Sequence, residues 1–525
     1  MADGFDLRDE PWIPVRWGSG ASSWCGLREL FHRAHEIVDL ELPVPPAASG
    51  LLRILAAMTA RIARDEGVRL DDEDIAEEIT TWLETRERVL ASGQFDPTAV
   101  EAYLDEEVPA GRFDLFDPVR PFLQDPRLAA ECVDVQGSPN PSGVNKLVFG
   151  RPTGVNGAVL FGHFTDGKPV AVPAAEAAWH LIAQLYCGPA GQCTPRRITE
   201  VRTGSGDAGP QRKAVSYHAW APDLFTTLVL AVPVPDGGAD ADVPDECPWE
   251  TGELPDPLAP LTELTWPGRV LTGRFRHAVL LVPNADRTAA ADAYITWSTH
   301  APKSTARDPY VILDRGTEGQ LNVREADGTR ALWRDVDALL LMDGSRTLRP
   351  HSLNSLPPLL RQHLSVRAYG FDQDGKQTDT TWFEATTPPL LHWQEDSDPR
   401  MARHLARCHQ AAEDVGDRLE YAARLAWKLA TDAGAATTNA VKLDRRKPGP
   451  WAAAALSRYW PAAEREFWQL AHPDRCDTAP LPPLVTAALT ALDDAIGAAN
   501  RADIRVARAR TRARAAVRAL LRAAA

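Results

Sequence analysis

The stretch MARHLARCHQAAEDVGDRLEYAARLAWKL, from Met401 to Leu429, decides the fold of the last quarter of the chain. Its apolar residues recur at alternating spacings of four and three, at Met401, Leu405, Cys408, Ala412, Val415, Leu419, Ala422, Ala426 and Leu429. That spacing keeps them on one face of a helix and is typical of a seam between packed helices. We therefore expect a long helix that packs against others.

Further helical patterns follow this helix. One covers about 450–471, where Pro461 should split the helix or start its second part. Another runs from about Pro482 toward the C-terminus, with a break near Gly497–Asn500. Because the composition changes near Pro388-Pro389, we expect a C-terminal four-helix bundle over 389–525.

Residues 1–388 show mixed patterns and predict a large mixed α/β domain with irregular loops, so the fold class is α+β. Strand character around Trp12 is limited by Pro11 and Pro14 to an edge or irregular strand. The other expectations are helices over about 47–66, 71–92 and 173–186, an irregular stretch over 111–167, β-like runs at 226–234 and 277–283, and an acidic surface loop over 233–257.

Composition limits the possible functions. The 525 residues carry a net charge of -15, which argues against indiscriminate binding to nucleic acid but allows a local basic patch. The seven cysteines are widely spaced without a CxxC pair, so neither a disulfide framework nor a zinc knuckle is expected. An acidic N-terminus and the lack of a long apolar run favour a cytoplasmic protein with no membrane contact.

The last predicted helix is rich in arginine. Arg501, Arg505, Arg508 and Arg512 share one face, while Arg510, Arg514, Arg518 and Arg522 form a second row. Arginines spaced four apart repel one another, and phosphate or an acidic partner would relieve that repulsion. The alternative is a solvated face that pairs with acids elsewhere in the chain.

Three other segments could contact nucleic acid. SVRAYGFDQDGKQTDTTWFE (365–384) predicts a hairpin that turns at Asp374-Gly375, with long polar side chains at its tip. Residues 140–162 combine glycines, Lys146, Arg151 and Phe149, which suits contact with a nucleic-acid backbone. TGSGDAGPQRK (203–213) loosely resembles a phosphate-binding loop, but it lacks the residue order GxxxxGK[ST] of a nucleotide-binding P-loop. An ordinary surface turn and plain loops remain the alternatives.

Catalytic templates are missing from the sequence. There is no HExxH, GxSxG or HD pair, and no DxD cluster with a matching second half. Cys408 lies on the predicted helix seam, so a packed thiol is favoured over a ligand even though His404 and His409 are near in sequence. We therefore expect a protein that is not an enzyme and has no cofactor.

Two motifs resemble one family. LRDEPWIPVR (7–16) resembles the start of the CasA family, the large subunit of the type I-E CRISPR surveillance complex Cascade. FDPVRPFLQDP (116–126) resembles another family segment, and RAYGFDQDGKQ (367–377) sits where that family has a minor-groove hairpin. The resemblance runs along the whole chain in order.

The resemblance implies a set of DNA-binding residues that would read the protospacer-adjacent motif (PAM). They are a glutamine wedge at Gln373 or Gln377, with Lys376 beside it; Asn145, Lys146 and Phe149 in the first loop; Gly204, Gly206 and Gly209 in a glycine loop; and Arg287 as a basic minor-groove residue. Some relatives have a cysteine cluster suggestive of zinc, which this chain lacks, so no metal is expected.

The implied function is non-catalytic inspection of the PAM through the minor groove, opening of the duplex, stabilisation of the R-loop and recruitment of a helicase-nuclease. The implied partners are double-stranded DNA, crRNA, other Cascade subunits and that helicase-nuclease. Two alternatives stay open: a nuclease of an unfamiliar family, and a scaffold subunit without DNA contacts.

Overall fold

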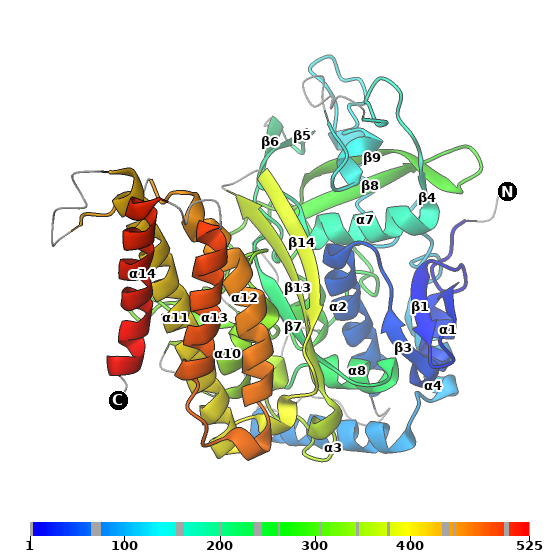
Figure 1. Ribbon diagram of the computed structural model, residues 1–525. Helices are drawn as coiled ribbons and strands as arrows, with labels where there is room; N and C mark the ends of the chain where they lie inside the picture. The colour runs from blue at the N-terminus through cyan, green and yellow to red at the C-terminus, as the bar shows by residue number, and fades with distance from the viewer. Residues whose placement is uncertain are drawn as a thin grey trace. The chain divides into compact units, whose positions relative to one another are not determined.

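The computed structural model describes residues 4–64, 75–153, 162–199, 202–235, 244–260, 263–304, 306–342, 346–374, 378–432, 441–444, 447–497 and 503–523. The chain folds as two units (Figure 1). The first comprises Met1–Arg330 and Arg346–Leu391, and the second comprises Ala331–Ser345 and His392–Ala525. The α+β class with a C-terminal helical bundle is confirmed.

The first unit contains many short elements. Its helices are α1 (Leu27–His32), α2 (Pro45–Ile62), α3 (Ile75–Ser92), α4 (Pro97–Glu101), α5 (Leu128–Glu131), α6 (Val144–Leu147), α7 (Ala174–Cys187), α8 (Leu224–Ala231) and α9 (Gly268–Thr272). Its strands are β1 (Ile13–Trp17), β2 (Ser22–Cys25), β3 (Ile37–Leu40), β4 (Val172–Pro173), β5 (Gly191–Arg197), β6 (Arg202–Gly206), β7 (Val215–Trp220), β8 (His277–Pro283), β9 (Ala289–Trp297), β10 (Leu313–Arg315), β11 (Leu321–Val323), β12 (Thr347–Leu348), β13 (Ser365–Asp374) and β14 (Thr378–Thr386).

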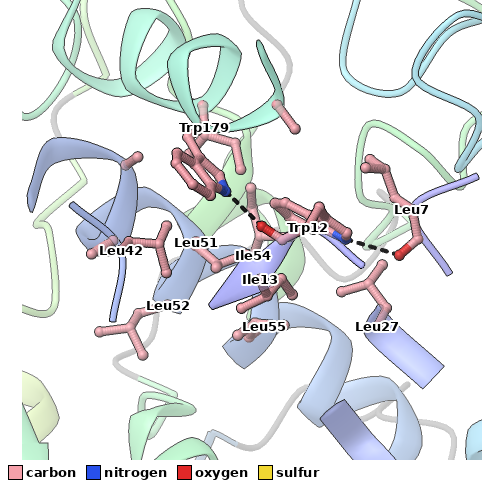
Figure 2. Packing of buried hydrophobic residues seen from close by; sticks show 14 of the residues in the cluster. Leu7, Trp12, Ile13, Leu27, Leu42, Leu51, Leu52, Ile54, Leu55 and Trp179 are labelled. Atoms are coloured by element: carbon pink, nitrogen blue, oxygen red, sulfur yellow. Dashed lines mark hydrogen bonds between the residues drawn. The ribbon is translucent and has the colours of Figure 1, made fainter. Parts of the chain in front are cut away.

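The core of this unit forms around α2, whose residues from Pro46 to Ile62 are all buried. The helix packs against α7, α8 and α9. A Cβ at Gly50 would lie 2.5 Å from Ile182 Cγ2, so glycine lets α2 and α7 approach closely. One turn earlier on α7, the Trp179 indole donates to the Trp12 carbonyl at 2.7 Å (Figure 2). The WIPVR motif is therefore a core element.

The strands form small antiparallel sheets rather than one large sheet. Their orders are β2-β1-β3, β14-β13-β7, β4-β9-β8 and β11-β10-β12, with β5 and β6 as a separate pair. In the second of these, β13 lies between β14 and β7, so the predicted hairpin is anchored to the body of the unit from Ser365 to Gly370.

Four long helices make up most of the second unit: α11 (Pro399–Thr431), α12 (Pro450–Leu470), α13 (Leu481–Ile496) and α14 (Ile504–Ala523). They run side by side, and α11 packs against the other three (Figure 1). Asp398 caps α11 by accepting from the Met401 amide at 2.9 Å. All nine predicted seam residues are buried, which confirms the four-three pattern.

A segment distant in sequence completes the second unit. Ala331–Ser345, which includes α10 (Val336–Leu340), belongs with the bundle and not with the residues around it in the sequence. Trp333 is buried with its ring 4.9 Å from that of Phe467, and Arg334 binds Glu413 at 2.7 Å. The predicted boundary at 388/389 placed this segment in the mixed domain, because one buried tryptophan in a short stretch gives no periodic signal that would link it to the bundle.

Several local expectations are wrong. The 226–234 run is largely helical, since α8 covers Leu224–Ala231 and Asp223 caps it by accepting from the Thr226 amide. In the 233–257 stretch, Cys247 and Trp249 are buried, so this part is core and not a surface loop. Helix α12 continues through Pro461, whose ring is exposed.

The opening strand was predicted to be an edge or an irregular strand. It is not an edge, since β1 lies between β2 and β3, but it is irregular, with a shift of register between Arg16 and Trp17. The Pro14 carbonyl accepts from the Glu41 amide at 2.8 Å, so the strand forgoes only the one hydrogen bond that proline cannot donate.

Candidate nucleic-acid interface

The hairpin β13–β14 extends from Ser365 to Thr386 (Figure 1). Pairing continues to Asp374, which lies opposite Thr378, with an irregularity between Asp372 and Gln373. The two-residue turn centred on Asp374-Gly375 is therefore wrong, because Asp374 still belongs to the strand. The tip residues Lys376 and Gln377 lie outside the described residues.

Gln373 lies in the body of the hairpin and not at its tip. It faces Asp379 across the strand pair and is only 9% exposed. In contrast, Asp379 and Thr380 on the facing strand are exposed. A glutamine that serves as a wedge must reach out of the protein, and the burial of Gln373 limits its reach.

The hairpin is tied to two other predicted segments through Phe371. Phe149, from the first loop, contacts the Phe371 ring edge-on at 5.6 Å between centroids. Arg212, from the 203–213 segment, stacks over the same ring at 4.5 Å and forms an ion pair with Asp379. We call Phe149, Phe371, Arg212 and Asp379 the hairpin clamp. It brings together segments that lie more than 200 residues apart in the sequence.

The first loop is partly built into the core. The Asn145 amide donates to Asp166 at 2.9 Å, and the residue is 1% exposed. The Gln184 amide donates to the Lys146 and Leu147 carbonyls and fixes helix α6 on α7. Burial lowers the pKa of the partly buried Lys146 ammonium. In this conformation Asn145 has a structural role, whereas Phe149 belongs to the hairpin clamp.

The three predicted glycines differ in their surroundings. A Cβ at Gly209 would lie 2.5 Å from the Tyr186 carbonyl oxygen, so internal packing alone requires glycine there. Gly206 is less constrained, since a Cβ would lie 3.4 Å from Trp297, and at Gly204 it would lie 3.0 Å from Pro195. Gly204 and Gly206 lie on β6, which pairs with β5.

Arg287 lies in the turn between β8 and β9 with a positive φ of 58°. Its guanidinium donates to the Phe116 carbonyl and lies 3.5 Å from the Asp114 carboxylate. Arg287 therefore contacts the FDPVRPFLQDP segment and the Asp114 side chain before it, and not the hairpin clamp.

In the second unit, the two arginine rows of α14 have different environments. Arg510 and Arg514 both bind Asp493 on α13. Although burial raises the pKa of the Asp493 carboxyl, the hydrogen bonds from these two arginines hold it below its usual value. Arg510 and Arg514 of the second row therefore pair with an acid elsewhere in the chain, as the alternative to nucleic-acid binding expects.

The other row has exposed side chains at Arg505, Arg508 and Arg512, while Arg501 lies outside the described residues. The buried stripe of α14 consists of Val506, Ala509, Ala513 and Val517. We call Arg505, Arg508 and Arg512 the basic face of the bundle.

Sequence inspection missed three members of the hairpin clamp: Phe371, Arg212 and Asp379. Arg212 was part of the 203–213 segment, but nothing in its spacing linked it to Asp379. The one useful signal was the strand pattern itself. Phe371 lies in a strand, where successive side chains point to opposite faces, and its large ring needs partners on one of those faces.

The described parts of the chain hold no group of three or more His, Cys, Asp or Glu residues that could bind a metal ion. Cys408 is buried, and burial raises the pKa of its thiol to about 12, so it is a packed apolar residue. Among the described helices, none is long and apolar enough to cross a membrane.

Comparison with known proteins gives first the class and then the family. The model of the CRISPR-associated protein Cse1 family matches residues 6–520, which makes the chain a CRISPR-associated protein with a mixed unit and a helical bundle. The chain belongs to the Cse1 family, also named CasA.

Individual relatives support this assignment. CRISPR-associated protein CasA/Cse1 of Thermus thermophilus is 28% identical over 439 residues, or 80% of this chain and 77% of that protein. A chain in a solved CRISPR RNA-guided surveillance complex is 37% identical, with a TM-score of 0.84, covering 98% of this chain and 99% of its own. Cse1 of Thermobifida fusca shares the fold, with a TM-score of 0.72 at 20% identity and 98% coverage of both chains.

Proposed function

We propose that this chain is the large, non-catalytic subunit of an RNA-guided DNA surveillance complex, where it inspects the PAM and helps to open the target duplex. The observation that carries the proposal is the full-length similarity to a chain of a CRISPR RNA-guided surveillance complex. The other partners would be crRNA and further Cascade subunits, with a helicase-nuclease recruited later.

The hairpin clamp gives this proposal a physical basis. A tip that enters the minor groove must resist being pushed back. Strand pairing with β7 fixes the base of the hairpin, and Phe149 and Arg212 pack on Phe371 nearer to the tip. Minor-groove patterns are degenerate, so such a site would accept several related PAMs. A wedge at the tip would unstack the first base step at a cost of a few kcal/mol, after which the guide would pair with the target strand.

The burial of Gln373 supports Gln377 as the wedge, since Gln377 belongs to the segment that joins the two strands. Lys376 beside it would contact phosphate. Gly204 and Gly206 would let the duplex approach closely. At Gly209, packing against Tyr186 already requires glycine. Arg287 would reach DNA only after leaving its contacts with Phe116 and Asp114.

The direct test is PAM-duplex binding by the reconstituted complex with and without this chain. We expect affinity and PAM preference to be lost when the chain is omitted and restored when it is added back. Unchanged affinity and preference would mean a scaffold without DNA contacts. DNA cutting by the purified chain that depends on a metal and on one carboxylate would mean a nuclease.

The basic face of the bundle should contribute to holding displaced DNA strands. Replacing Arg505, Arg508 and Arg512 by glutamate should reduce the salt slope of DNA binding by up to about 3, since each phosphate contact contributes ~0.9. The measurement is the affinity of the assembled complex over a series of salt concentrations.

A matched control carries the same charge change elsewhere in the second unit. Arg458, Arg465 and Arg475 are also exposed, and their replacement by glutamate should leave the slope nearly unchanged. Equal slopes for both triple variants would assign the basic face to solvent or to a protein neighbour.

A further inference from the structure

A turn in the first unit packs on the hairpin at a place that the hairpin clamp does not cover. The Gly328 amide donates to the Asp372 carboxylate on β13 at 2.9 Å. A Cβ at Gly328 would lie 2.2 Å from Thr381 Cγ2 on β14, so a larger residue would displace Thr381. Asp372 and Thr381 face each other across the hairpin, directly before the irregularity at Gln373. Gly328 therefore supports both strands close to the point where the described part of the hairpin ends.

The backbone of this turn is itself fixed by hydrogen bonds. The Ala326 amide donates to the Lys213 carbonyl at 2.7 Å, in the 203–213 segment. The Asp327 carboxylate accepts from the Thr329 amide at 2.9 Å, and the Asp327 carbonyl accepts from the Arg330 amide at 3.0 Å. The chain therefore leaves the hairpin through a closed turn and not through an open loop.

A few residues further on, the chain is anchored in the second unit, which begins here at Ala331. We call Ala331–Leu340 the strap. It consists of the short helical turn Leu332–Asp335 and helix α10. The Trp333 side chain of the strap is buried, and its ring lies 4.9 Å from that of Phe467 on α12. The strap thus contributes a core residue to the bundle.

Polar contacts hold the strap on the bundle at both of its ends. Near its start, the Arg334 guanidinium donates to both Glu413 carboxylate oxygens at 2.7 Å and lies 3.6 Å from the centre of the Trp460 ring. At its end, the Leu340 carbonyl accepts from the Glu395 amide at 3.0 Å, in the segment that leads into α11. Because these contacts add to the buried Trp333, the strap belongs to the bundle as a rigid part of it.

The two anchors, Gly328 on the hairpin and Trp333 in the bundle, are close together along the chain. A fully extended chain spans at most ~3.3–3.6 Å per residue, so the stretch between them can span at most about 17 Å. The hydrogen-bonded turn that ends at Arg330 shortens that reach. A displacement of the hairpin or of the bundle beyond this reach must break one anchor or pull on the other.

We propose that the strap is a tether through which the bundle supports the hairpin, so that Asp372, Arg334 and Glu413 are positioning residues for duplex opening. A hydrogen bond to a carboxylate and a bidentate ion pair are strong enough to transmit a load. Coupling between two sites is reciprocal, so a change at Glu413 must reach Gly328, and a change at Asp372 must reach the strap. The role in duplex opening rests on the proposed function, whereas the link from Glu413 to Gly328 does not.

The link is tested without DNA, by hydrogen exchange of the full chain. Glu413→Ala, a change in the second unit, should speed exchange of the Gly328 amide in the first unit at least about fivefold, the lower end of usual couplings between sites. The control is Asp414→Ala, since Asp414 is the neighbouring acid on α11 and is exposed. It should leave the exchange of Gly328 unchanged. Equal exchange in the wild type and Glu413→Ala overturns the tether, whatever the chain does with DNA.

The role in duplex opening is tested in the reconstituted complex by lengthening the tether. Three glycines inserted between Arg330 and Ala331 keep both anchors but add slack. Opening of the first base pair beside the PAM, followed with a fluorescent base analogue, should slow about tenfold, while initial duplex binding stays the same. The control is the same insertion between Glu318 and Gly319, in the exposed turn between β10 and β11, which should open DNA at the wild-type rate.

Variants of Asp372 show whether the hairpin anchor and the tether act together. Asp372→Ala should slow opening as much as the insertion after Arg330, and Asp372→Asn should slow it less because asparagine keeps an oxygen acceptor for Gly328. The insertion combined with Asp372→Ala should be no slower than either change alone, since both act through one tether. Additive effects overturn the tether, as does wild-type opening by the insertion variant in a complex that still prefers its PAM. A wild-type complex without PAM preference would instead overturn the proposed function, and the role of the tether in opening with it.

Discussion

Replacing Asp308 by alanine should lower the free energy of unfolding of the first unit by about 3–5 kcal/mol. Arg53 on α2 is 1% exposed, and its guanidinium binds both Asp308 oxygens, at 2.9 and 3.0 Å. The same group donates to Ser216 on β7 and stacks over Tyr310. Without the carboxylate, a buried cation would remain at the point where the core helix meets the sheet that carries the hairpin.

The measurement is chemical unfolding of the full chain, with Asp314→Ala as the matched control. Asp314 also pairs with an arginine, Arg324, at 2.7 Å, but its side chain is 41% exposed, so its loss should cost less than about 1 kcal/mol. Replacing Arg53 and Asp308 together by methionine and leucine should recover most of the loss, because no charge is then left buried. Equal losses for Asp308→Ala and Asp314→Ala would contradict this explanation.

At acidic pH, the free energies of unfolding of the wild type and Asp308→Ala should differ less. Although burial raises the pKa of the Asp308 carboxyl, the nearby Arg53 and Arg274 charges hold it below its usual value. A carboxyl with a lowered folded pKa contributes its stability above the unfolded pKa of about 3.9. That contribution is lost as the pH falls through the folded pKa, so the two proteins should become similar in acid.

The regular parts of this fold could be predicted from the sequence because their signal is periodic. The seam from Met401 to Leu429 repeats often enough to specify a buried helix face, and Gly497 ends α13 with a positive φ of 74° as its position suggested. The run at 226–234 gave a false signal, since a fully buried short helix and a buried strand are both continuously apolar.

The candidate site was harder to predict because it depends on contacts between distant segments. The sequence identified the hairpin, the first loop and the 203–213 segment separately. Only the fold reveals that Phe149, Arg212 and Phe371 meet, and that Asn145 and Gly209 are held by the protein interior. Residue type alone could not distinguish Gln373 from Gln377, because burial depends on where strand pairing stops.

Replacing Gln377 by alanine should slow opening of the PAM-proximal duplex about tenfold to a hundredfold, whereas Gln373→Ala should change it less than about threefold. Unstacking one base step costs a few kcal/mol, so loss of a side chain that offsets part of that cost changes the rate by this order. Both variants leave the net charge unchanged, and each serves as the control for the other.

The experiment follows a fluorescent base analogue in the first base pair beside the PAM, using the reconstituted complex and a duplex with one fixed PAM. Initial duplex binding should change little in both variants, since phosphate contacts and not the wedge supply most of the affinity. Gln373 is 9% exposed opposite Asp379, so its replacement should instead lower the stability of the hairpin. If Gln373→Ala slows opening and Gln377→Ala does not, the strand must release Gln373 on DNA binding, and the wedge would have to be assigned to Gln373.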